Sequence, residues 1–143
     1  MSTLRLPYYQ LSPEAYQGLA ATKKALEASS LGAGLIELVY LRISQINGCA
    51  FCLEMHSKAL RARGEEQARL DALAGWRVSG LYSEKERAAL EWAESLTRLE
   101  ASGAPDSAFE PLRSLFSEAQ IADLSFAVAL MNAFNRLAVG MRQ

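Results

Sequence analysis

Histidine and cysteine are scarce in this sequence, which has one histidine and two cysteines among its 143 residues. Structural zinc sites usually take their ligands from two separated pairs, and the chain has no second cysteine pair. There is no GxGxxG segment and no phosphate-binding loop, so the sequence does not indicate a nucleotide or flavin cofactor. Chemistry that needs a thiol or an imidazole is therefore confined to Cys49, Cys52 and His56.

An excess of either charge is also missing, because 15 basic and 16 acidic residues leave a net charge of −1. No basic stripe indicates a nucleic-acid partner. The first ten residues have no apolar signal core, and the apolar run from Phe126 to Met131 is far too short to cross a membrane. We therefore expect a cytoplasmic protein with neither a nucleic-acid nor a membrane partner.

Strand signals are absent as well, whereas apolar residues recur at helical spacing along most of the chain. Half of the residues are hydrophobic, so a chain of this length can bury a core as one domain, which we assign to residues 1–143. We expect an all-α fold. The predicted elements are an extended arm over residues 1–12, helices over 13–29, 33–46, 49–63 and 65–73, a helix capped by Ser83, a short helix capped by Asp106 or Ser107, and a helix from Ser117 to about Gly140.

Several packing expectations follow from the same pattern. We expect the arm to dock through its apolar residues and Trp76 to anchor a loop. On the first long helix, Lys23 falls on the face that we expect to be in solvent. In the helix capped by Ser83, apolar residues at helical spacing form a row that we expect to face the core, and this row ends at Leu99. The apolar residues expected to dock the arm are Leu4, Leu6, Tyr8 and Tyr9.

The segment from Cys49 to His56 is the candidate site. On a helix, Cys52 lies about 60° from Cys49, and His56 returns to within about 20° of it. Asn47 and Gly48 indicate a turn, which places Cys49 at the helix start, where unpaired N–H groups favour a thiolate. Cys52 and His56 are i and i+4, so the imidazole can exchange a proton with that thiol. This pattern is typical of a redox dithiol with its own base.

A carboxylate, Glu37, lies inside the most apolar predicted helix. A carboxylate in such surroundings is costly unless it is paired. One interpretation is a general base or proton store that feeds His56. The other is that Glu37 faces solvent or makes a structural hydrogen bond.

Other interpretations of the cysteines remain open at this stage. The two residues could be small buried apolar side chains. A structural disulfide would close too short a loop to restrain the unfolded chain much. Zinc could be held by Cys49, Cys52, His56 and a fourth ligand from elsewhere. The redox dithiol is the interpretation that we favour, with no metal bound.

The spacing E-x11-C-x2-C-x3-H, formed by Glu37, Cys49, Cys52 and His56, resembles the core motif of the alkylhydroperoxidase D-like (AhpD-like) proteins of the carboxymuconolactone decarboxylase superfamily. The segments LVYLRISQINGCAFCLEMHSKALRARGE, KERAALEWAESLTRL and MNAFNRLAVG resemble that family too. The resemblance implies an AhpD-like bundle of about six to seven helices that assembles into a homo-oligomer, a trimer or hexamer. It also implies that Glu37 serves as the relay glutamate.

The function implied is that of a thiol-dependent peroxidase, in which Cys49 and Cys52 reduce a hydroperoxide and Glu37 and His56 move protons. The partners would be a hydroperoxide and an external protein or small-molecule dithiol, with no bound cofactor. Helix position favours Cys49 as the attacking thiol, and contact with His56 favours Cys52. Phe51 stands where some members of the family have a second histidine, which puts full peroxidase proficiency in question.

Two other functions are compatible with the same resemblance. A dithiol adaptor would pass electrons between partner proteins and would need Cys49 exposed. Lactone decarboxylation, the other activity of the superfamily, has no need for a CxxC pair, so the two cysteines argue against it.

Overall fold

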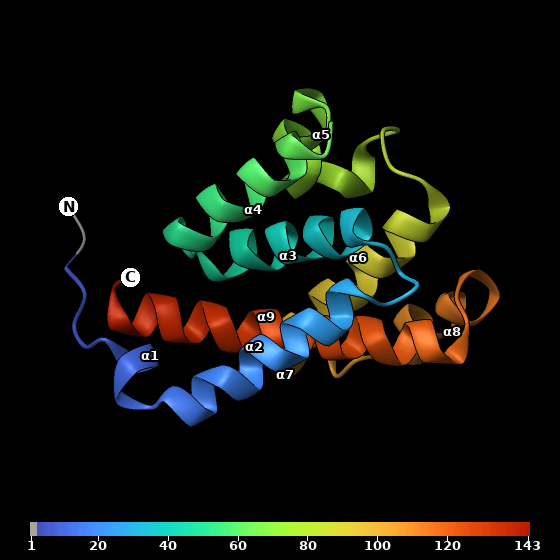
Figure 1. Ribbon diagram of the computed structural model, residues 1–143. Helices are drawn as coiled ribbons and strands as arrows, with labels where there is room; N and C mark the ends of the chain where they lie inside the picture. Colours follow the sequence, from blue (N-terminus) through green and yellow to red (C-terminus); the bar gives the residue numbers. More distant parts are fainter. Residues whose placement is uncertain (1–2) are drawn as a thin grey trace.

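The protein is a helical bundle, seen here in a computed structural model that describes residues 3–143 (Figure 1). Within these residues there are nine α-helices, one 3₁₀ helix and no strand, which confirms the all-α prediction. The count exceeds the expected six to seven because α1 and α7 are four-residue helices that the sequence pattern does not reveal. The elements are α1 (Tyr8–Leu11), α2 (Pro13–Glu27), α3 (Ala33–Asn47), α4 (Ala50–Ala62), α5 (Gln67–Ala72), η1 (Leu73–Val78), α6 (Glu84–Thr97), α7 (Leu99–Ser102), α8 (Asp106–Leu115) and α9 (Glu118–Met141).

Helix α3 is the centre of the bundle and packs against α4, α6 and α9. In Figure 1 it lies between α4 on one side and α9 on the other. It begins after Gly32 and ends before Gly48, both of which have a positive φ that suits glycine. Eight of its residues, from Ile36 to Ser44, are buried, which accounts for its almost uniformly apolar sequence.

Helix α9 is the longest element and starts with the predicted capping box, in which Ser117 and Gln120 exchange hydrogen bonds with each other's backbone. By length and composition alone it could span a membrane. Its Leu124, Val128 and Met131 lie in the main core of the bundle. The second predicted capping box, Ser83 with Glu86, opens α6 in the same way.

The buried carboxylate of Glu94 holds η1 and α6 to α3. Its oxygens accept hydrogen bonds from Arg42 at 3.1 Å and from the indole N–H of Trp76 at 3.0 Å. Trp76 is 3% exposed, so the expectation that it anchors this region is confirmed. The segment around it is a 3₁₀ helix and not the predicted loop.

Two packing expectations are each wrong at one residue, Leu99 and Leu6. Leu99 is 53% exposed because α6 ends at Thr97. The non-helical backbone of Arg98 then turns the chain, so Leu99 does not continue the row of apolar residues that faces the core. Of the four arm residues expected to dock, Leu6 is 51% exposed, whereas Leu4, Tyr8 and Tyr9 are half-buried, so that expectation is wrong for Leu6 alone. The arm is also held by its backbone, with the N–H of Arg5 donating to the carbonyl of Met141 at 2.7 Å. The arm is also shorter than expected, since residues 8–11 form α1. The predicted cap of the short helix shifts by one residue, because Pro105 caps α8.

Candidate functional site

The turn between α3 and α4 places Cys49 at a helix N-terminus. Gly48 adopts the left-handed conformation (φ 65°, ψ 38°) and ends α3, and the N–H of Cys49 donates to the carbonyl of Ser44 at 3.1 Å. Cys49 is the N-cap of α4, and its sulfur accepts the N–H of Cys52 at 3.3 Å. The Cys49 sulfur therefore lies where the helix dipole and a backbone donor stabilise negative charge.

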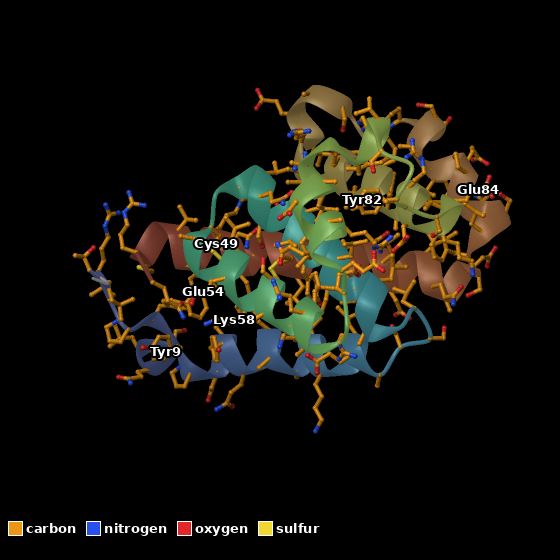
Figure 2. The ribbon with its side chains drawn as sticks, turned by 90° about the horizontal axis from the view of Figure 1, so that it is seen from above. Tyr9, Cys49, Glu54, Lys58, Tyr82 and Glu84 are labelled. Carbon is orange, nitrogen blue, oxygen red and sulfur yellow. A yellow bond between two sulfur atoms is a disulfide. The ribbon has the colours of Figure 1, made fainter. Side chains whose placement is uncertain are left out.

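Cys49 and Cys52 form a disulfide, with Cα atoms 5.2 Å apart. Figure 2 shows Cys49 at the beginning of α4. The two residues are 1% and 2% exposed, and they pack against Ala138 and Val139 near the end of α9. The pair can therefore close within the first turn of the helix without leaving the protein interior.

Glu37 and His56 form a contact between α3 and α4. The Nδ1 atom of His56 lies 2.7 Å from the Oε2 atom of Glu37, and the two side chains are 1% and 14% exposed respectively. The alternative in which Glu37 faces solvent is therefore wrong. If Nδ1 carries the proton donated to Glu37, the other ring nitrogen, Nε2, keeps its lone pair. Nε2 is buried and has no hydrogen-bond partner among the described residues.

Tyr40 is a buried neighbour of His56 that helical spacing alone does not distinguish from the apolar residues around it. Its ring centroid lies 5.3 Å from that of the imidazole, and its hydroxyl is buried without a partner in the described part of the chain. Burial raises the pKa of Tyr40 above its ordinary value, and the negative charges of Glu37 and Glu27 raise it further. The phenol therefore stays protonated at neutral pH.

An amide network ties the cysteine turn to α9. The Asn47 side chain donates to the side-chain oxygens of Asn132 and Asn135, at 3.0 Å each. Asn135 is fully buried and donates to the hydroxyl of Ser44, whose carbonyl accepts the N–H of Cys49. The signal in the sequence was the pair of asparagines inside an apolar helix, but the sequence does not reveal which turn they meet.

Beside Cys52 there is a cavity of about 160 Å³. Phe51 forms part of its wall and is 42% exposed, which makes the entrance apolar on that side. Lys23 also lines it, so the prediction that this side chain belongs to the solvent face is only half right. A smaller cavity of about 130 Å³ adjoins Cys49. Over residues 3–143, no group of three or more His, Cys, Asp or Glu side chains is placed to hold a metal ion.

The chain matches the carboxymuconolactone decarboxylase family over residues 13–95, and we conclude that it belongs to this family. It is 34% identical over 137 residues to YdfG of Bacillus subtilis, an uncharacterized protein, covering 96% of this chain and 93% of that one. The matched segment contains all four residues of the candidate site.

Two solved structures share the fold. A protein of unknown function from Agrobacterium tumefaciens, provisionally described as the antioxidant defence protein AhpD, is 40% identical, with a TM-score of 0.94 and coverage of 99% of this chain and 97% of that one. A peroxidase-related protein from Silicibacter is 27% identical, with a TM-score of 0.80 and coverage of 93% and 71%. The fold and the CxxC pair are therefore those of an AhpD-like member of the family.

Proposed function

We propose that this protein is a thiol-dependent peroxidase that reduces organic hydroperoxides. The observation that carries the proposal is the Cys49–Cys52 disulfide at the start of α4, beside a cavity. The contact between buried His56 on α4 and half-buried Glu37 on α3 supports it. A helix N-terminus stabilises a thiolate, and a paired imidazole can take up the thiol proton and return it to a leaving oxygen.

The proposed reaction begins with attack of the Cys52 thiolate on the O–O bond of the hydroperoxide. The sulfur gains one oxygen and becomes a sulfenic acid, and the other oxygen leaves as an alcohol after receiving the proton held by His56. The Cys49 thiol then displaces water from the sulfenic acid and forms the disulfide. An external dithiol reduces the disulfide by exchange and is itself oxidised to a disulfide.

Cys52 is proposed as the attacking residue because it lines the larger and more aromatic cavity, whereas Cys49 lines the smaller one. Trapping of the sulfenic acid distinguishes the two cysteines. In Cys49→Ser, one equivalent of hydroperoxide should give a sulfenic acid on Cys52 that dimedone labels. Labelling of Cys49 in Cys52→Ser, with none in Cys49→Ser, would reverse the assignment.

The experiment that tests the function is a thiol count on reduced protein before and after one equivalent of cumene hydroperoxide. We expect the loss of two thiols, reversed by dithiothreitol, and no reversible disulfide in Cys49→Ser or Cys52→Ser. If both thiols of the wild-type protein remain titratable, the chain keeps the motif without peroxidase chemistry.

The burial of Cys49 bears on the adaptor alternative. A protein that passes electrons directly to a partner needs one sulfur at its surface, and Cys49 is 1% exposed. A small dithiol entering a cavity therefore suits this site better than a large protein surface does.

We also propose that the chain assembles into a trimer or hexamer. Phe126 on α9 is 63% exposed and Leu99 is 53% exposed, and burial of such side chains favours association. Light scattering coupled to gel filtration should give three or six times the 15.6 kDa chain mass. A monomer at micromolar concentration would contradict this assembly.

A further inference from the structure

We propose that the cavity beside Cys52 selects organic hydroperoxides that carry a carboxylate, with Lys23 as the residue that recognises it. This inference names a substrate class for the proposed peroxidase and rests on that function. Its basis is the composition of the cavity wall, where one cation stands among aromatic and thioether side chains.

The wall of the cavity is suited to an apolar organic molecule. Its volume of about 160 Å³ is roughly five times the ~30 Å³ that a water molecule occupies in the liquid, so it accommodates a compact group and not a long chain. Aromatic and thioether side chains contact such a group through dispersion and hydrophobic burial. The side chains that do so here are Tyr8, Tyr16, Phe51, Met55, Met131 and Phe134.

Lys23 places a positive charge in the wall of the cavity. Of the described residues that line the cavity, it alone has a charged side chain. Tyr16 precedes it by seven positions on α2, about two turns, so both side chains lie on the same face of the helix. Because Lys23 and Cys52 line the same cavity, one compact molecule can present a carboxylate to the ammonium and a peroxide to the sulfur.

The ion pair that Lys23 makes with Glu27 is weak enough for a ligand to displace Glu27. Its ammonium lies 3.1 Å from the carboxylate of Glu27, and the two side chains are 36% and 48% exposed. Ion pairs this exposed contribute little because water and salt screen them. A ligand carboxylate on the cavity side has less water around it and interacts more strongly with the same ammonium. A lysine ammonium carries one charge and lacks the two parallel N–H donors of a guanidinium, so it suits a ligand with a single negative charge.

The test compares two probes that differ by one para-carboxylate group, namely cumene hydroperoxide and its para-carboxylate derivative. The readout is the ratio of their second-order rate constants for thiol loss in the reduced, full-length protein. In the wild type we expect the carboxylate to react at least about threefold faster, with the preference shrinking as salt is added. In Lys23→Gln the ratio should fall to about one or below.

Two further variants test whether the effect is specific to this ammonium. Glu27→Gln removes the competing carboxylate and should raise the ratio, whereas Lys24→Gln, on the neighbouring exposed residue, should leave it unchanged. A general effect of net charge would instead move Lys23→Gln and Lys24→Gln alike. That result would overturn the inference.

A binding measurement separates failure of the inference from failure of the proposed function. Calorimetric titration with 4-isopropylbenzoate, which cannot oxidise a thiol, should show binding that Lys23→Gln weakens at least about threefold. Equal rates for the two hydroperoxides would overturn the substrate preference and leave the peroxidase standing. No thiol loss with either probe would overturn the function, and retained benzoate binding would then still support the carboxylate site. Absence of benzoate binding would overturn the site itself.

Discussion

The Nδ1 atom of His56 lies 2.7 Å from the Oε2 atom of Glu37, although the two residues are 19 positions apart and lie on different helices. The contact orients the imidazole and leaves its second nitrogen without a partner among the described residues. A carboxylate in this position stabilises the imidazolium that forms when the ring accepts a proton. The arrangement suits a group that takes up a proton and gives it back.

Replacement of His56 should slow the oxidation of the reduced protein by cumene hydroperoxide. We expect His56→Asn to lower the rate about 100-fold, because general acid–base catalysis contributes on that order. Glu37→Gln should cost about tenfold, since an amide still accepts the Nδ1 proton but does not stabilise the imidazolium. Stopped-flow thiol oxidation across pH 5–9 measures both. Glu54→Gln, at an exposed residue two positions before His56 on α4, is the control and should react like the wild type (Figure 2). An unchanged rate in His56→Asn would remove the imidazole from the mechanism.

Loss of the Glu94 carboxylate should destabilise the fold strongly. Arg42 is 7% exposed and would be left as a buried cation without its counter-ion. We expect Glu94→Gln to lower the free energy of unfolding by about 3 kcal/mol in urea denaturation. Arg98→Gln, which changes a half-exposed partner of the same carboxylate, should cost less than about 1 kcal/mol. Equal effects of the two substitutions would refute the importance of the buried pair.

The hydroxyl of Tyr40 is expected to contribute nothing to stability. It is buried and has no partner in the described structure, so Tyr40→Phe removes an unsatisfied group. The free energy of unfolding should stay the same or rise by about 1 kcal/mol. Tyr82→Phe is the matched control, because the Tyr82 hydroxyl donates to the carbonyl of Arg69 and its loss should cost about 1 kcal/mol. A loss of stability in Tyr40→Phe would mean that the hydroxyl has a partner in solution.

Glu86 should contribute stability that disappears in acid. Its burial opposes ionisation, but hydrogen bonds from Arg69 and Ser83 outweigh this and hold its pKa below the ordinary 4.5. A carboxylate with a depressed pKa in the folded state stabilises the fold fully above the unfolded pKa. That contribution is lost as pH falls through the folded pKa.

We therefore expect Glu86→Gln to be less stable than the wild type at pH 7, by about 1 kcal/mol, with the gap narrowing below pH 4.5. Urea denaturation at pH 7, 5 and 3.5 measures the gap. The control is Glu84→Gln, which alters an exposed carboxylate of the same turn of α6. A gap that does not change with pH would contradict a stabilising role for the charge of Glu86.

Local features of the fold were predictable because each depends on residues near one another in the sequence. The capping boxes at Ser83 and Ser117 and the turn at Gly48 lie where the pattern indicates. Prediction failed at Leu99, where one non-helical residue changes the direction of the chain, and at Leu6 and residues 8–11 of the arm, which are exposed and helical respectively.

The sequence by itself determined an all-α chain with two cysteines on the first turn of one helix and a carboxylate within the helix before it, since helical spacing and caps are local properties. Only the tertiary structure decided that Glu37 meets His56 and that Asn135 holds the cysteine turn. It also decided that Lys23 shares a cavity with Cys52. These contacts join separate helices, whose relative positions depend on how their apolar faces pack, and no local pattern encodes that packing.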